Sequence, residues 1–319
     1  MLSYDWLKIV GAAAALILVW TLVFTMTATR ITSAQQFTIV NYYGNLSINS
    51  TKMSDTLSDC MREGVFSYEV IETTTVDVPG SGDYGGQVLE ARFATSEGDV
   101  IFVPNVENKE ASYELNGETL YESYIQTLVR SYGYALCNLD PEAENGYFKK
   151  MEKFLNTYYN GGWENGELNE ELVEQDFRAR ITRNKDKRFK KQAEIEQGIQ
   201  DEIARIAKYR DGLKEFYGYL NSSLIELTKT AVYDHQDQET LLREGVFSIN
   251  LCPNKDTMGK LKEYTAYSAT YIDEAGEEKS IITAENMNVA FITFADVEPS
   301  FEYENLLYIN YLIRQVKTA

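Results

Sequence analysis

An uncharged, apolar run from Ile9 to Met26 constrains this chain more than any other feature of its sequence. As an α-helix the run reaches about 27 Å, which is close to the hydrocarbon thickness of a bilayer. It is also longer than the apolar region of an ordinary signal peptide. We therefore expect an uncleaved transmembrane anchor over residues 9–28.

The flanks of this run indicate how the anchor is oriented, but only weakly. Lys8 on one side and Arg30 on the other nearly balance under the positive-inside rule. Because the leading segment is short, we expect residues 1–8 to be a cytoplasmic tail and the body to lie on the extracytoplasmic side of the cell membrane. Cleavage is the alternative, since Thr32 and Ala34 form a weak small-x-small site.

The chain is strongly acidic. Its 49 Asp and Glu residues outnumber 30 Lys and Arg residues, and the net charge is -19. Such a surface repels phosphate backbones, so we expect no nucleic-acid partner. A basic stretch over residues 178–191 is the exception, and it is either a docking patch for an anionic surface or a helix face balanced by acidic neighbours.

Cysteine and histidine are scarce, which limits metal chemistry. The chain has three widely spaced cysteines, Cys60, Cys137 and Cys252, and a single histidine, His235. Zinc sites of the usual Cys and His types need more ligands at closer spacing, so we expect no metal site. The cysteines are interpreted as small buried thiols, with one disulfide as the alternative.

The first part of the body alternates between strand and helix patterns. We expect strands at 37–43, 65–78 and 100–103, and helices at 50–63 and 87–98. The last strand, VIFV, is wholly apolar, as is typical of the buried centre of a mostly parallel sheet. The β-α-β-α-β order predicts an open parallel sheet with right-handed crossovers.

The middle and the end of the chain differ in character. Long helical patterns fill residues 119–244, whereas residues 245–319 return to strands, a hairpin around DEAGEEK and a closing helix from Tyr303 to Lys317. We therefore expect one α/β lobe from residues 37–118 and 245–319, and a helix-rich second lobe from residues 119–244.

The hexapeptide REGVFS occurs twice, at residues 62–67 and 243–248. In both copies we expect the glycine, Gly64 or Gly245, to end a helix and the following valine to begin a strand. The flanking sequences do not align, so the repeat indicates two entries into a sheet and not a duplication.

A glycine-rich loop, PGSGDYGG, places Gly80, Gly82 and Gly85 in a formal GxGxxG between a strand and a helix. The acidic residue that should follow the next strand and hold a ribose is not evident, because Pro104 and Asn105 stand there. We expect no cofactor. No GxSxG, HExxH or phosphate-binding loop occurs either, so we expect that the chain is not an enzyme.

The organisation resembles type II extracellular solute-binding proteins of ABC importers. The likeness lies in FTIVNYY, in the helix that ends in REG before SYEVIE, and in QVLEARFATSEGDVIFVPN. Toward the end of the chain it lies in FSINL, NVAFITF and YENLLYINYLI. The implied fold class is α/β: an N-terminal transmembrane helix, then a two-lobed, periplasmic-binding-protein-like (type II) body with a helix-rich second lobe.

The resemblance implies a cleft that holds a small polar solute, with a sugar favoured, and presents it to ABC permease subunits. Aromatic rings stack on sugars, and amides and carboxylates bind hydroxyls. The alternative is a non-catalytic accessory, sensor or structural membrane protein with a degenerate binding-protein fold. The residues expected at the cleft are Asn41, Tyr42, Tyr43, Asp83, Tyr84, Asn105 and Trp163.

Overall fold

The computed structural model forms two compact units, residues 1–32 and residues 33–319, which are described separately. The structure describes residues 6–27, 35–42, 50–67, 72–78, 84–184, 188–237, 240–257, 259–264, 268–272, 276–294 and 303–317.

The described residues of the first unit form one helix, α1 (Trp6–Thr27), which contains the apolar run. Every side chain described in it, from Lys8 to Val23, is exposed, and Trp20 is 72% exposed. Among the helices of the described residues, none combines the length and the apolar character that a membrane crossing requires. The expected anchor over residues 9–28 stays a prediction.

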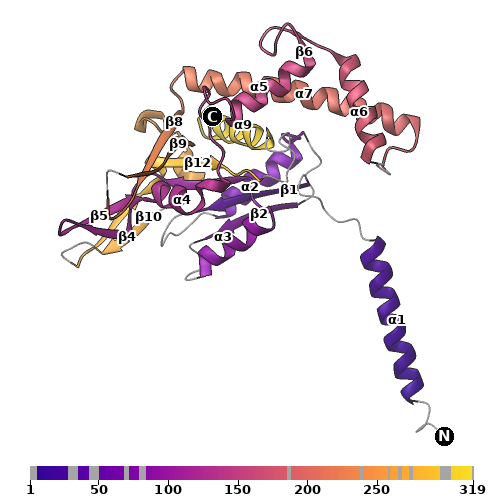
Figure 1. Ribbon diagram of the computed structural model, residues 1–319, viewed down its shortest axis with the longest axis horizontal. Coiled ribbons are helices and arrows are strands. Elements are labelled where there is room, and N and C mark those ends of the chain that lie inside the picture. Colours follow the sequence, from indigo (N-terminus) through magenta and orange to yellow (C-terminus); the bar gives the residue numbers. More distant parts are fainter. Residues whose placement is uncertain are drawn as a thin grey trace. The chain divides into compact units, whose positions relative to one another are not determined.

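A six-stranded mixed sheet forms the centre of the second unit, in the order β2-β1-β3-β12-β9-β8 (Figure 1). The first three strands pair in parallel, which confirms the parallel sheet expected for the first part of the body, whereas the three pairings that involve the later strands are antiparallel. The reason lies in the connections, because β8 and β9 follow each other across a short loop and no helix carries the chain back between them. The strands are β1 (Gln36–Asn41), β2 (Glu72–Asp77), β3 (Val100–Pro104), β8 (Glu226–Tyr233), β9 (Leu241–Asn250) and β12 (Met287–Phe291).

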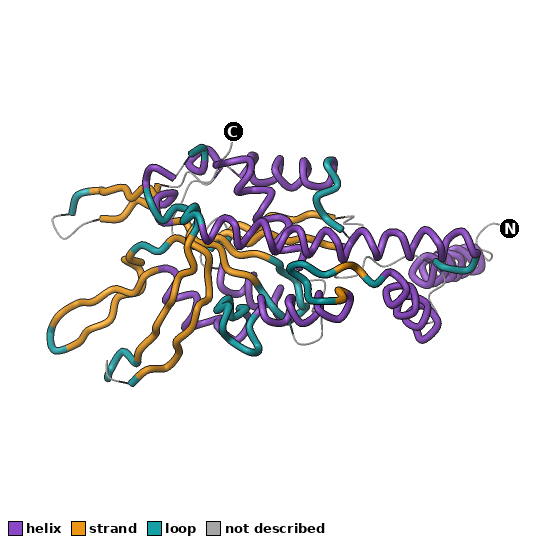
Figure 2. Tube along the Cα trace, turned by 90° about the horizontal axis from the view of Figure 1, so that it is seen from above, coloured by secondary structure: helices purple, strands orange, loops and turns teal. Residues whose placement is uncertain are grey.

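Helices cover both faces of this sheet (Figure 2). Phe37 of β1 packs against Tyr308, with ring centroids 5.1 Å apart, whereas Tyr42 at the end of the same strand packs against Tyr132. Residues an odd number apart point to opposite faces of a strand, so the helices of Tyr308 and Tyr132 lie on opposite sides. The helices are α2 (Ser50–Arg62), α3 (Gly85–Ala94), α4 (Tyr124–Tyr132), α5 (Tyr147–Tyr158), α6 (Glu170–Asn184), α7 (Gln192–Asn221), α8 (Leu261–Tyr264) and α9 (Glu304–Lys317).

The closing helix α9 is the most deeply buried of these. Its residues from Glu304 to Ile313 are all buried, because the sheet lies on one side of it and α7 on another. A helix that is buried on nearly all sides is expected to be apolar all round, yet α9 carries Asn305 and Asn310 in its interior. Because buried amides need hydrogen-bond partners, these two residues indicate that α9 makes specific polar contacts as well as apolar ones.

Short hairpins complete the body, and the longer ones extend from one end of it (Figures 1 and 2). The hairpin around DEAGEEK is confirmed as β10 (Ser268–Ile272) and β11 (Glu278–Ile282), whereas β4 (Glu107–Leu115) and β5 (Glu118–Ser123) were not expected. Asn116 and Gly117, with φ of 53° and 83°, form the β4–β5 turn, for which Asn-Gly is the favoured pair. The smallest pair is β6 (Tyr159–Asn160) with β7 (Glu167–Leu168).

The two REGVFS copies have different structures. In the first, Gly64 ends α2 with a φ of +63°, as predicted, but the described strand begins only at Glu72. The second copy lies wholly inside β9, where Gly245 pairs with Thr230, so the prediction that Gly245 ends a helix is wrong. Pairing with β8 imposes the extended conformation on this copy, whereas none of the described residues pairs with the first copy as a strand.

The outer edge of β8 is covered by side chains from α4. Gln126 donates to the carbonyl of Ala231 at 3.1 Å, and Arg130 donates to the carbonyl of Tyr233 at 2.5 Å. Arg130 is held in place by both carboxylate oxygens of Glu122. Since β8 and the start of β9 belong to the sheet although they fall within residues 119–244, the division of the body into two lobes stays a prediction.

Candidate functional site

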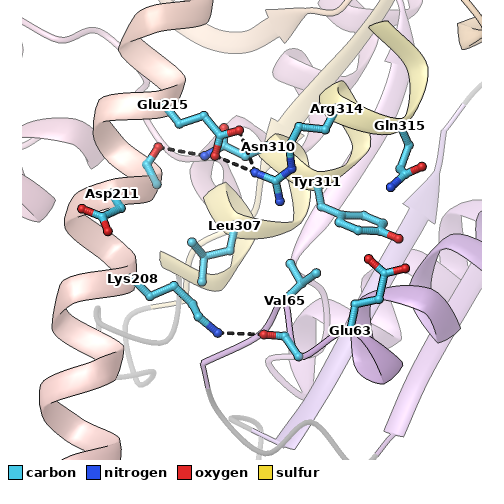
Figure 3. Close-up of a pocket in the computed structure, with 12 residues that line it drawn as sticks. Glu63, Val65, Lys208, Asp211, Glu215, Leu307, Asn310, Tyr311, Arg314 and Gln315 are labelled. Atoms are coloured by element: carbon cyan, nitrogen blue, oxygen red, sulfur yellow. Dashed lines mark hydrogen bonds and ion pairs between the residues drawn. The ribbon is translucent and has the colours of Figure 1, made fainter. Parts of the chain in front are cut away.

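A pocket of about 580 Å³ opens where α7, α9 and the segment after α2 meet (Figure 3). The segment after α2 contributes Glu63, Gly64 and Val65, which belong to the first REGVFS copy. The helices contribute one face each: Lys208, Asp211, Gly212 and Glu215 from α7, and Leu307, Asn310, Tyr311, Arg314 and Gln315 from α9.

Close contact between α7 and α9 at one turn sets the floor of the pocket. The side-chain amide of Asn310 donates to the carbonyl of Gly212 at 2.8 Å. A Cβ at position 212 would lie 2.8 Å from Cδ2 of Leu307, well inside ordinary van der Waals contact. Gly212 therefore allows the two helices to approach, and this approach puts Asn310 and Leu307 into the lining.

Both cations of the lining already bind protein acceptors. Lys208 Nζ donates to the carbonyl of Gly64 at 2.7 Å, and Arg314 Nη1 lies 2.6 Å and 2.7 Å from the two carboxylate oxygens of Glu215 (Figure 3). The Lys208 hydrogen bond connects the segment after α2 to α7. The Arg314 contact bridges α9 and α7 at the other end of the pocket.

The remaining charges of the lining are acidic. Glu63 and Asp211 are both exposed at the rim, so the three carboxylates of the lining exceed its two cations. Burial, and then the nearby Glu63 carboxylate, raise the pKa of Tyr311 to about 12, so its phenol is neutral at physiological pH. The site thus offers negative charge beside a neutral hydroxyl.

Among the described lining residues, Asn310 supplies the one buried side-chain acceptor that is left without a donor. The residue is 1% exposed, and its Oδ1 makes no hydrogen bond within the described structure although its amide nitrogen does. A buried polar atom of this kind costs about 1–3 kcal/mol unless a donor satisfies it. A solute or water with an N–H or O–H group is the natural complement.

At the start of α9, Glu304 holds the segment after α2 to this helix. Its Oε2 accepts from the backbone N–H of Ser67 at 2.8 Å, and its Oε1 accepts from the hydroxyls of Ser67 and Tyr209. Glu304 is 4% exposed, and burial raises the pKa of its carboxyl above the ordinary value. One buried carboxyl thus joins α9, α7 and the segment after α2.

The residues expected from the resemblance lie elsewhere, at the carboxyl ends of the strands. Asn41 ends β1 and is fully buried, and neither side-chain atom of its amide has a hydrogen-bond partner among the described residues. Tyr42 packs against Tyr132, and its burial raises the pKa of its phenol. Asn105 is exposed just after the neighbouring strand β3, and Tyr84 is 68% exposed before α3.

Trp163 does not share that location. It is 8% exposed and packs near Tyr217, with centroids 6.1 Å apart, and its backbone N–H donates to Asn156. This is the environment of a core residue. Tyr43 and Asp83 lie outside the described residues. A ligand role for the seven expected residues stays a prediction.

The sequence carried a weak signal of the pocket. The apolar face expected for the closing helix, including Leu307, is confirmed as buried, but Asn305 and Asn310 interrupt that face five residues apart. Two amides in an otherwise apolar helix indicate specific hydrogen bonds, and both do bond to backbone carbonyls, of Asp99 and Gly212.

The chemistry available elsewhere is limited. Within the described residues, no group of three or more His, Cys, Asp or Glu side chains is arranged to hold a metal ion. Cys60, Cys137 and Cys252 are buried reduced thiols, as interpreted from the sequence. In the basic stretch, Arg178 pairs with Glu174 at 2.7 Å and Arg180 pairs with Glu202 at 3.0 Å, which agrees with a balanced helix face.

Comparisons with models of protein families, with curated proteins and with solved structures find no match to this chain.

Proposed function

We propose that the chain is a non-catalytic binding protein that holds a small polar solute in the pocket between α7 and α9. The observation that carries this proposal is the buried Oδ1 of Asn310, an acceptor that lacks a donor and belongs to a residue of the pocket lining. The pocket volume of about 580 Å³ falls within the range of small-molecule sites. The charged pairs around the pocket hold its walls in place before a solute enters.

We further propose that residues 9–28 anchor the body to the cell membrane, with the body on the extracytoplasmic side. The support is the hydropathy of the sequence and the exposure of large apolar side chains such as Leu16 and Trp20 in α1. An exposed apolar helix needs an apolar environment, and a bilayer supplies one. The resemblance to solute-binding proteins supports delivery of the solute to an ABC importer.

A thermal-shift screen of the full-length chain in mild detergent tests the binding role. Sugars, amino acids, short peptides and polyamines are each added at several concentrations. A solute at a hundredfold excess over its Kd should stabilise the folded state by about 3 kcal/mol. A flat response to every solute class would contradict the proposal.

Two matched variants locate the site. Asn310→Leu removes the acceptor in the pocket, whereas Asn305→Leu removes an equally buried amide of α9 that bonds to Asp99 outside the pocket. Circular dichroism establishes that each variant folds. The solute-induced shift should vanish in the first variant and persist in the second, and loss in both would place the site elsewhere.

A labelling experiment tests the membrane arrangement. The native cysteines are buried, so a new cysteine at Tyr134, which is 67% exposed, becomes the accessible thiol of the described body. A membrane-impermeant maleimide should label Tyr134→Cys in intact cells. Labelling only after the cells are broken would refute the extracytoplasmic body.

An accessory, sensor or structural role is the second candidate. The favouring observation is that Lys208 and Arg314 already bind protein acceptors, so the pocket walls are held without a solute. Copurification with a membrane complex, together with no thermal shift by any solute, would favour this candidate.

A further inference from the structure

The charge balance of the pocket narrows the class of solute, and this step rests on the proposed binding function. An anionic solute needs a cation that is not already bound, but Lys208 donates to Gly64 and Phe66, and Arg314 is held by both oxygens of Glu215. Lys208 donates to neutral carbonyls and keeps its charge, but the three carboxylates of the lining, one of which pairs with Arg314, oppose an anion. The pocket disfavours phosphates and carboxylates.

The acidic groups are more available. Asp211 contacts Arg210 at 3.2 Å, and Glu63 lies 3.8 Å from Arg62, but these pairs are exposed and outside the pocket floor. Exposed pairs of this kind contribute about 0–1 kcal/mol, so they exchange partners at little cost. Glu63 also accepts a hydrogen bond from the Tyr311 hydroxyl, which is neutral and leaves the charge of the carboxylate for a cation at the rim.

The apolar part of the lining suits a hydrocarbon chain. Leu307 lies next to Asn310 on α9, and Val65 lies between Leu307 and Glu63 (Figure 3). A ligand that donates an N–H to Asn310 and carries positive charge toward Asp211 or Glu63 would cover this apolar surface with methylene groups. Its burial would add favourable free energy.

We infer that the pocket binds a small organic cation with primary ammonium groups, of which a short linear diamine is the simplest example. One ammonium group donates to Oδ1 of Asn310, the methylene chain contacts Leu307 and Val65, and the second ammonium group lies at the acidic rim. This assignment replaces a sugar with a cation as the favoured solute.

Isothermal titration of the full-length chain in mild detergent tests the ligand class with four probes. The probes are 1,4-diaminobutane, its fully N-methylated analogue, glucose and inorganic phosphate. The methylated analogue has the same charge and no N–H donor, so it should bind at least tenfold more weakly, because a lost hydrogen bond to a buried acceptor costs about 1–3 kcal/mol. Glucose and phosphate should not bind in the pocket.

Matched substitutions on α7 test the role of the rim. Asp211→Asn should weaken diamine binding by about two- to fivefold, as for the loss of an exposed charge. Asp201→Asn is the same change on the same helix, at an exposed residue that bonds to Gln197 outside the lining, and should leave the affinity unchanged. Because both sites are exposed, neither change should prevent folding.

The outcomes separate the two proposals. Equal affinity for the diamine and its methylated analogue, or equal weakening by the two Asp→Asn variants, would overturn the assignment of a primary ammonium ligand to this pocket. Binding of glucose, lost in Asn310→Leu, without binding of the diamine would overturn the ligand class and leave the binding function standing. No binding by any probe or by the wider solute screen would overturn both.

Discussion

Gly212 and Gly218 lie on the same helix, α7, and offer a direct test of how the pocket floor is built. A Cβ at Gly218 meets nothing within 4 Å, whereas a Cβ at Gly212 meets Leu307 Cδ2 at 2.8 Å. The second distance is about 0.6 Å short of the 3.4 Å at which ordinary contact begins. The same Gly→Ala change is therefore neutral for packing at one site and a clash at the other.

The expected magnitudes follow from two opposing effects. Alanine gains about 1 kcal/mol over glycine inside a helix, so Gly218→Ala should raise the free energy of unfolding by about that amount. Overpacking a tight contact costs about 1–3 kcal/mol, so Gly212→Ala should range from neutral to about 2 kcal/mol destabilised. The difference between the two variants, about 1–3 kcal/mol, measures the close approach of α7 and α9.

Urea unfolding of the full-length chain, followed by circular dichroism and by fluorescence, provides the measurement. Coincident transitions by both probes and equal m values are required before the midpoints are compared. A double-mutant cycle that combines Gly212→Ala with Leu307→Ala should reveal a favourable coupling, since removing Cδ2 makes room for the new methyl group. If Gly212→Ala stabilises the protein as much as Gly218→Ala and the cycle shows no coupling, the packing explanation is wrong.

Three further predictions each concern one residue. Because the pKa of Glu304 is raised, the folded state binds its proton more tightly than the unfolded state, so the free energy of unfolding falls as pH rises from about 4.3 toward the folded-state pKa. Urea titrations between pH 4 and 8 should show this slope in the wild type and a flatter profile in Glu304→Gln; parallel profiles would contradict the assignment. Gly64→Ala should cost about 1 kcal/mol at a φ of +63° although no atom opposes the methyl group, and an unchanged midpoint would show that the turn relaxes. Asn41→Leu should raise the free energy of unfolding by roughly 1 kcal/mol, because it removes two buried polar atoms without partners, and a marked loss would indicate a hydrogen bond that the structure lacks.

Local signals in the sequence predicted the elements that depend on local chemistry. Gly64 ends α2 as expected, the wholly apolar strand β3 lies inside the sheet with every residue buried, and the closing helix α9 begins within one residue of its predicted start. In each case a glycine, an apolar run or a helical period is sufficient. No partner elsewhere in the chain is needed to specify them.

Elements that depend on distant partners were not predicted. Residues 226–233 continue a helical pattern in the sequence but form β8, because pairing with β9 outweighs local propensity. Pairing with a distant strand also explains why Gly245 lies in β9, whereas Gly64, in an identical hexapeptide, ends a helix. The pocket is harder still to predict, since its lining comes from residues 63–65, 208–215 and 307–315. No periodicity connects segments so far apart.

The cover that α4 places over β8 has a consequence for how this protein behaves among other copies of itself. An open edge strand is a template on which a second chain can add a strand, and unchecked addition leads to aggregation. Here Gln126 and Arg130 occupy carbonyls at Ala231 and Tyr233 that an incoming strand would need. These two side chains therefore prevent another strand from pairing with β8. The substitution Arg130→Ala would expose this edge to self-association, and because Arg130 does not line the pocket it would leave the pocket unchanged.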